Sequence, residues 1–184
     1  ASLTGTGTAD DAFHVYLTTD LTSPGTAVWS KNTTWSDTNE GTSPTISLTP
    51  GQSVWLLVDA DNFNGGPAMF VADFQISGGG FLFSNGSTSL STNTTNWTVN
   101  ETSFSDPAST PYSMGLNVSG LQIWGPRPGI SDGAEAIWAY NADWTNGHSG
   151  HAYFATQITA VPEPETYAML LAGLGVLGFM GRRR

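Results

Sequence analysis

A run of oxygen-bearing side chains stands near the middle of the sequence. Asp59, Asp61 and Asn64 lie within a short segment that ends in a Gly-Gly pair, and Asp73 follows further along. Calcium takes about six to eight oxygen ligands, so carboxylate and amide oxygens around a glycine turn suit it. The spacing departs from the EF-hand pattern, and the same residues also describe a plain turn with solvated acids between two strands. We expect either a calcium site formed by these four residues or such a turn.

Two histidines near the end of the polar part, His148 and His151, have a spacing that suits zinc when it occurs on a helix. Asp143 lies just upstream. Gly147 and Gly150 predict a loop here instead, and no third ligand follows at motif spacing. We therefore favour an exposed loop over a zinc site.

Tryptophans in the second half of the chain offer a different chemistry. The apolar C–H face of a sugar stacks on such rings, while polar side chains bind the hydroxyls. Trp124 opens a Gly-Pro-Arg-Pro-Gly loop that carries Arg127, and Trp144 lies in a second loop. These three residues are the candidates for a sugar site. The alternative is that the tryptophans fill the core, which we favour for Trp55 and Trp138 and leave open for Trp124 and Trp144.

Catalytic patterns are weak in this sequence. There is no cysteine and no Gly-x-Ser-x-Gly elbow for a nucleophile. Asp132, Glu135 and Asp143 could supply the two acids of a glycosidase, but their separation in space cannot be read from the sequence. We expect a protein without enzymatic activity and without a cofactor, unless calcium binds.

The charge balance excludes several classes of partner. Only 11% of the residues are charged, and the formal net charge is −10 with a pI near 4.3. A chain of this kind has no basic face for nucleic acid or for anionic lipid. The absence of cysteine also rules out a disulfide framework. The surface is instead rich in neutral hydroxyl and amide side chains.

The sequence pattern predicts that short strands position these side chains. Pro-Gly, Asn-Gly and Gly-Gly turns separate apolar runs, and no helical period of useful length occurs before residue 160. The expected strands are 12–17, 26–29, 45–48, 53–60, 68–76, 81–83, 95–99, 136–140 and 152–158. This pattern predicts an all-β fold, a single antiparallel β-sandwich or jelly roll over residues 1–160, with an irregular stretch from about 100 to 133.

The last part of the chain, residues 161–184, differs from the rest. Pro162 and Pro164 end the final strand, because proline lacks an amide donor and fixes φ. Thr166 can cap an apolar helix that runs to Gly181 and spans roughly 24 Å at about 1.5 Å per residue. The hydrocarbon core of a bilayer is roughly 30 Å thick, and terminal arginines can snorkel across the difference. We predict a short hydrophobic α-helix; a buried helix of the globular body is the alternative, which the all-round apolar surface disfavours.

This tail resembles the PEP-CTERM sorting signal of Gram-negative bacteria. That signal has a Val-Pro-Glu-Pro motif, a Leu/Gly-rich transmembrane stretch and a short arginine cluster. The matching residues are Val161, Pro162, Glu163, Pro164, the stretch 167–180, Arg182, Arg183 and Arg184. The resemblance implies export, transient anchoring in the inner membrane, processing near Pro-Glu-Pro by an exosortase, and a final place at the cell surface or in the extracellular polymer matrix.

The polar part is also similar to the jelly roll of galactose-binding-like domains. The similarity rests on Asp-Asp-Ala-Phe-His-Val-Tyr-Leu at residues 10–17 and on Pro50-Gly51 before a long strand. Ala136-Ile137-Trp138 and Ala152-Tyr153-Phe154 complete it. The resemblance implies a fold and, by analogy alone, a carbohydrate ligand.

Three functions follow from these patterns. The first is a non-catalytic exported surface or matrix protein that acts in adhesion, with exosortase and the inner membrane as partners during export. The second is a subunit of an extracellular filament, since strands with few lysines leave sheet edges open to self-association. The third is a lectin-like module that binds galactose-type sugars near Trp124 and Trp144, with calcium at Asp59 and Asp61. Outside the cell, the expected partner is extracellular polysaccharide or another copy of the chain.

Overall fold

The computed structural model describes residues 1–31, 39–42, 52–105, 108–118 and 123–161, together with Met169, Leu171, Ala172 and Leu174. Within these residues almost all regular structure is strand. The strands are β1 (Ser2–Ala9), β2 (Ala12–Thr18), β3 (Trp29–Lys31), β4 (Asn39–Thr42), β5 (Ser53–Asn62), β6 (Phe70–Ser77), β7 (Phe81–Phe83), β8 (Ser89–Ser91), β9 (Thr98–Asn100), β10 (Tyr112–Leu116), β11 (Glu135–Trp138) and β12 (Gly150–Ala160).

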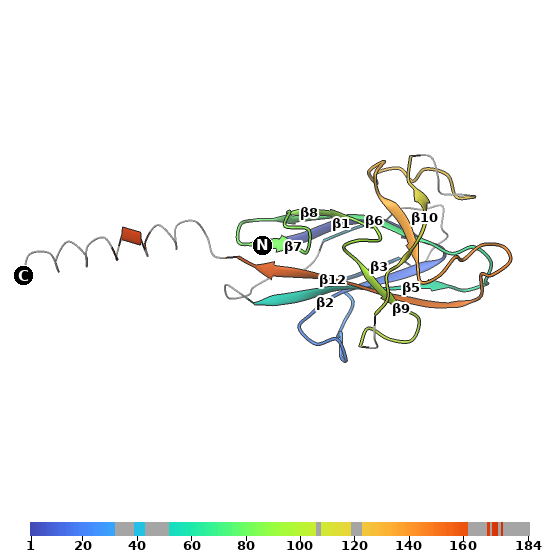
Figure 1. Cartoon of the computed structure of the whole chain (residues 1–184), viewed down its shortest axis with the longest axis horizontal. Helices are drawn as coiled ribbons and strands as arrows, with labels where there is room; N and C mark the ends of the chain where they lie inside the picture. Colours follow the sequence, from blue (N-terminus) through green and yellow to red (C-terminus); the bar gives the residue numbers. More distant parts are fainter. Residues whose placement is uncertain are drawn as a thin grey trace, which may run out of the picture.

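The strands form two antiparallel sheets (Figure 1). Sheet A has the order β10–β11–β6–β1–β4, with β8 also paired to β6. Sheet B has the order β3–β2–β5–β12–β7, with β9 also paired to β12. The longest ladder joins β5 to β12, from Asn62 opposite Gly150 to Ser53 opposite Thr159. Sheet B is therefore built around two long central strands.

The hydrophobic core lies between the two sheets and is dominated by aromatic rings. Phe70 of sheet A is fully buried, and its ring centroid lies 5.7 Å from that of Phe13 and 5.4 Å from that of Phe154, both in sheet B. Trp138 of sheet A adds an edge-to-face contact with Phe154 at 6.2 Å. Tilted and edge-to-face pairs at these separations are favourable. These rings hold the two sheets together.

The prediction of an all-β fold is confirmed, but β1 is not among the strands expected from the sequence. Gly5 and Gly7 weaken the strand pattern there, because glycine has a low strand propensity. The structure explains why a glycine is needed: a Cβ on Gly5 would lie 2.9 Å from the rings of both Phe74 and Trp29. Those two rings pack on one another at 5.9 Å against the strand. Close packing by Phe74 of the paired strand β6 and by Trp29 of sheet B has overridden local propensity.

Other differences concern strand boundaries. The strand expected at 26–29 begins only at Trp29, and the stretch expected to be irregular contains β10. The expected strand at 45–48 lies outside the described residues. So does most of the segment expected to form the C-terminal helix; its four described residues, Met169, Leu171, Ala172 and Leu174, are helical and exposed. The jelly-roll resemblance and the boundary after residue 160 stay predictions, although β12 does end at Ala160.

Candidate functional site

A histidine lies between two acids on the outer face of sheet B. Asp59 and Asp61 project from β5 to the same side because alternate residues of a strand share a face. His151 of β12 is directly opposite Asp61 in the ladder. Its Nδ1 lies 2.7 Å from Asp59 Oδ1, and its Nε2 lies 3.6 Å from Asp61 Oδ2. Strand alternation has thus brought together two of the residues expected to bind calcium.

The electrostatics of this cluster favour a protonated histidine. Partial burial lowers the pKa of His151, but the hydrogen bond to Asp59 and the charges of Asp59 and Asp61 outweigh it, so that the pKa is raised overall. Burial, with the nearby Asp59 and Asp11 charges, raises the pKa of Asp61 despite the opposing effect of His151. His151 therefore acts as an internal counter-ion for the two carboxylates.

The other two expected calcium ligands lie elsewhere. Asp73 belongs to β6 in the opposite sheet, where its carboxylate accepts hydrogen bonds from the Ser131 amide at 2.6 Å and from the Ser131 hydroxyl at 2.7 Å. Asn64 is exposed in the turn after β5. The four residues do not converge, because the alternation of β6 sends Asp73 to the outer face of sheet A. Among the described residues, no group of three or more acids, histidines or cysteines could hold a metal ion.

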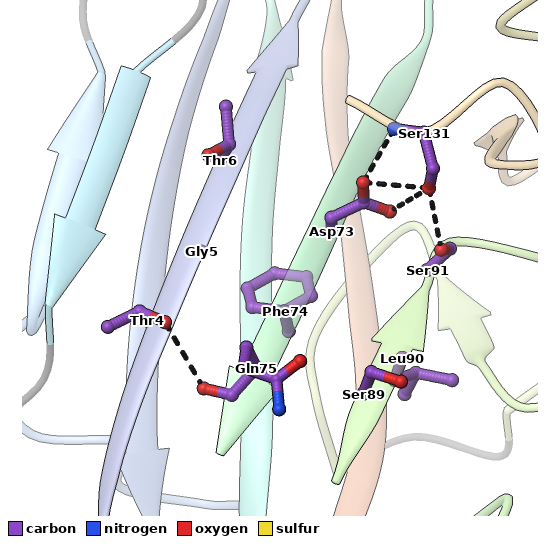
Figure 2. A pocket seen from close by; sticks show the side chains of 10 residues that line it. All are labelled: Thr4, Gly5, Thr6, Asp73, Phe74, Gln75, Ser89, Leu90, Ser91 and Ser131. Carbon is purple, nitrogen blue, oxygen red and sulfur yellow. Dashed lines mark hydrogen bonds between the residues drawn. The ribbon is translucent and has the colours of Figure 1, made fainter. Parts of the chain in front are cut away.

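Figure 2 shows a polar groove of about 500 Å³ on the outer face of sheet A. It is lined by Thr4, Gly5, Thr6, Asp73, Phe74, Gln75, Ser89, Leu90, Ser91 and Ser131. Its polar groups largely bond to one another: Ser131 binds Asp73, the Ser91 and Ser131 hydroxyls lie 3.2 Å apart, and Thr4 donates to the Gln75 carbonyl at 3.3 Å. Phe74 is only 2% exposed, so the groove offers no aromatic surface for stacking.

Trp124 is a core residue in this structure. It is 2% exposed, and its indole N–H donates to Asp10 Oδ2 at 2.8 Å. Arg127 turns back on its own loop, where its Nε donates to the Gly125 carbonyl at 3.1 Å and its Nη2 donates to the Trp124 carbonyl. Neither residue offers a surface to a sugar, because Trp124 is buried and the Arg127 guanidinium is hydrogen-bonded to backbone carbonyls.

Asp10, the partner of Trp124, gives a test of this buried contact. Burial raises the pKa of Asp10 from 3.8 to about 6, although the hydrogen bond from Trp124 opposes the shift. The folded protein then binds a proton more readily than the unfolded chain, so stability present at low pH is lost as pH rises from about 4 to about 6. Asp10→Asn removes the charge and keeps an oxygen for Trp124.

We expect the free energy of unfolding of the wild type to fall relative to Asp10→Asn by about 1–2 kcal/mol across this range, after allowance for the partial exposure of Asp10. Urea unfolding of both proteins at a series of pH values measures the difference. A difference that stays constant with pH would contradict the raised pKa.

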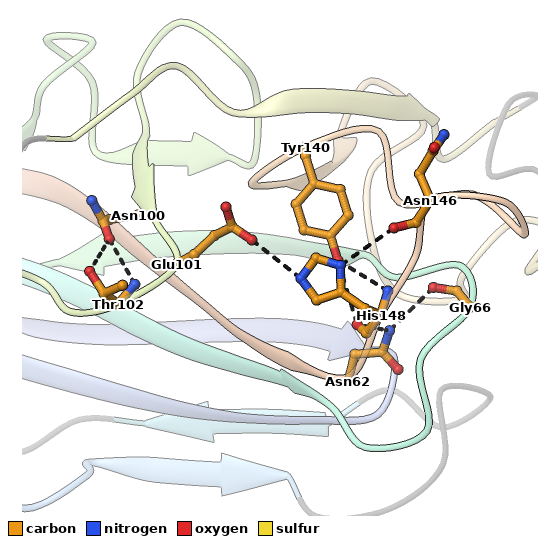
Figure 3. A network of polar contacts seen from close by, with 8 residues as sticks. All are labelled: Asn62, Gly66, Asn100, Glu101, Thr102, Tyr140, Asn146 and His148. Carbon is orange, nitrogen blue, oxygen red and sulfur yellow. Dashed lines mark hydrogen bonds and ion pairs between the residues drawn. The ribbon is translucent and has the colours of Figure 1, made fainter.

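The two histidines considered for zinc have separate partners. Figure 3 shows those of His148. His148 stacks on Tyr140 with ring centroids 4.7 Å apart and lies 3.6 Å from Glu101, whereas His151 binds Asp59. Asp143 accepts hydrogen bonds from the amides of Thr145 and Asn146 within its own turn, and these bonds lower its pKa. Asp143 and His148 thus lie in loops, as the glycine-rich sequence indicates, whereas the loop expected at His151 is wrong, because Gly150 begins β12 and His151 pairs with Asp61 in the ladder.

Glu135 and Trp144 complete the set of residues singled out from the sequence. The carboxylate of Glu135 accepts hydrogen bonds from the Thr94 amide at 2.9 Å and the Ser113 hydroxyl at 3.0 Å, which tie neighbouring segments together. Trp144 is 73% exposed and lies beside Gly66, whose Cβ, if present, would contact its ring at 3.5 Å. Of the expected sugar residues, only Trp144 is accessible.

A second groove, of about 380 Å³, lies on the outer face of sheet B. It is lined by Leu21, Trp55, Ser84, Asn96, Thr98, Phe104, Ser105, Ala108, Ala155, Thr156 and Gln157. Trp138 is buried as expected, but Trp55 is not a core residue: Val54 and Leu56 on either side of it point into the core. Alternation along β5 was the signal in the sequence that could have placed Trp55 on the outside.

The remaining functional segment is the tail that follows β12. Residues 160–184 match the family model of the PEP-CTERM protein-sorting motif. The chain carries a PEP-CTERM motif. No curated protein and no solved structure shows significant similarity to the chain.

The start of the PEP-CTERM motif overlaps the end of β12. Its first residue, Ala160, is the last residue of β12, and its amide still donates to the Gln52 carbonyl at 2.8 Å. The Val161 amide donates to the Gly80 carbonyl at the same distance. The processing residues Pro162, Glu163 and Pro164 come immediately after these last contacts and lie outside the described residues.

The PEP-CTERM motif indicates an exported protein that is sorted by an exosortase to the envelope or surface of a Gram-negative cell. Among the described residues, no helix has the length and apolar character needed to cross a bilayer. Arg182, Arg183 and Arg184 also lie outside the described residues, so their expected roles rest on the match to the sorting motif.

Proposed function

We propose that this chain is a non-catalytic surface or extracellular-matrix protein, whose β-sandwich body contributes to adhesion or matrix structure after exosortase sorting. The observation that carries the proposal is the PEP-CTERM motif at residues 160–184, attached directly to the last strand of the body. The sorting signal therefore adjoins the described end of β12 in the chain, next to the body that it would deliver.

The surface of the body supports this role. The chain has few charges, and the polar side chains that line the two grooves are hydroxyls and amides, with Asp73 as the one ionisable residue among them. Groups of this kind form hydrogen bonds with neutral polymers without strong dependence on salt. The work proposed for the body is binding, and it requires neither a metal nor a catalytic group.

Replacement of Pro162, Glu163 and Pro164 by alanine tests the sorting step. In a strain with its exosortase, we expect the wild type to appear at the surface or in the matrix without Arg184, and the triple variant to stay in the inner membrane with Arg184. Immunoblots of cell fractions and mass spectrometry of the C-terminus measure both. Glu165→Ala, a neighbouring acid outside the Val-Pro-Glu-Pro motif, is the control and should behave as wild type.

Three outcomes would contradict the proposal. The first is a surface protein that still ends in Arg184, and the second is an unchanged distribution in a strain without exosortase. The third concerns the matrix role: after cells are removed, the wild type should sediment with the extracellular polymer, and a protein that stays wholly in the supernatant would exclude that role.

A further inference from the structure

We propose that the groove between Trp55 and Phe104 on sheet B binds a neutral saccharide chain. The inference rests on the proposed function, because it names the ligand through which the body would hold the matrix. The sequence placed a sugar site at Trp124 and Trp144. The structure offers a different pair of rings, on the outer face of the sheet, combined with amide and hydroxyl groups.

The charge of the groove favours an uncharged ligand. None of its lining residues is ionisable; their polar groups are the amides of Asn96 and Gln157 and the hydroxyls of Ser84, Thr98, Ser105 and Thr156. The chain as a whole has a formal net charge of −10. An anionic polymer would be repelled on approach, whereas a neutral one would not.

The aromatic walls of the groove are held in place from behind. Phe104 makes edge-to-face contacts with Tyr16 at 5.9 Å and with Tyr153 at 5.1 Å, so two strands of sheet B support it. Trp55 is half-buried in β5, with the core residues Val54 and Leu56 fixing the strand on either side. Rigid rings bind a sugar face at little cost in side-chain entropy.

Two polar side-chain groups beside these rings have no hydrogen-bond partner among the residues that the structure describes. Gln157 is directly opposite Trp55 in the β5–β12 ladder, so the two side chains are neighbours on the outer face. Within the described residues, neither the indole N–H of Trp55 nor the side-chain amide of Gln157 forms a hydrogen bond. The Ser84 and Thr156 hydroxyls, by contrast, lie 3.0 Å apart and pair with each other. The Trp55 ring can stack on the apolar face of a pyranose, while its indole N–H and the Gln157 amide can form hydrogen bonds with the hydroxyls of the sugar.

Calorimetric titration of the full chain tests the proposal, in a detergent without a sugar head group. The probes are cello-, malto-, manno- and galacto-oligosaccharides, with oligogalacturonate of equal length as the anionic comparison. We expect at least one neutral probe to bind, and oligogalacturonate to bind at least about tenfold more weakly. Trp55→Ala should weaken binding by about tenfold or more, and Gln157→Ala by about three- to tenfold.

Two further variants keep the result interpretable. Trp55→Phe retains a ring and should stay within about threefold of wild type, which separates loss of stacking from loss of fold. Trp144→Ala removes the exposed tryptophan of another loop and should leave the affinity unchanged. The inference is overturned if no neutral probe binds, if Trp55→Ala binds as wild type does, or if Trp144→Ala loses binding instead. Each of these results leaves the sorting experiment untouched, and failed sorting would remove the proposed function whatever the affinity for sugar.

Discussion

Phe70→Ala is expected to lower the free energy of unfolding by about 3–5 kcal/mol, because it removes a fully buried ring and leaves a cavity. Phe70 contacts Phe13 and Phe154 across the core and Trp97 at 6.3 Å, so one substitution breaks the packing of sheet A on sheet B. A domain of this size has a total stability of about 5–15 kcal/mol. Chemical denaturation followed by tryptophan fluorescence measures the loss.

The matched control for Phe70 is Phe63→Ala. Phe63 is 53% exposed, and only its backbone amide is engaged, with Asp11 Oδ2 at 3.0 Å. Its substitution should change stability by less than about 0.5 kcal/mol. Equal effects of the two substitutions would mean that Phe70 does not lie at the centre of the core.

Asn117→Ala is expected to cost about 2–4 kcal/mol through lost hydrogen bonds. Asn117 is 1% exposed, and its side-chain amide donates to the carbonyls of Arg127 at 3.1 Å and Ile130 at 2.7 Å. Its Oδ1 accepts from the Arg127 amide at 2.6 Å. Alanine would leave all three backbone groups without this partner, at the base of the loop that carries Trp124.

Unfolding in urea measures the loss at Asn117, and amide hydrogen exchange at Arg127 locates it. The control is Asn64→Ala, an exposed asparagine for which a change below about 0.5 kcal/mol is expected. Unchanged exchange at Arg127 in the Asn117 variant would show that the amide is dispensable for the loop.

Strands with alternating apolar residues could be predicted from the sequence, because their pattern and their burial have the same cause. β2, β5 and β12 are of this kind. β1 and β10 could not be found, since glycines occupy positions that only the opposite sheet or a bulge explains. Strand propensity depends on the local sequence, so it contains no information about a ring contributed by a strand far away in the sequence.

The candidate site residues also divide into those placed by the local sequence pattern and those placed by the pairing of distant strands. Asp59 and Asp61 share a face because they are two residues apart on one strand, and this was visible in the sequence. Their contact with His151 depends on the register of β5 and β12, and the separation of Asp73 depends on which sheet β6 joins. Trp55, expected in the core, is half-exposed on the outer face, and Trp124, for which core and sugar site were both open, is buried. The reason is the same: burial of a tryptophan is decided by what covers it.

The attachment of the tail to β12 also decides how the body responds to mechanical force. β12 lies inside sheet B, with β5 along one edge and β7 and β9 along the other. A pull on Ala160 along the strand axis loads the whole β5 ladder and both shorter ladders in shear, so their bonds must rupture together. An edge strand under the same tension would peel away one bond at a time. A tether attached at the end of β12 would therefore pull on a strand that is paired along both sides within sheet B.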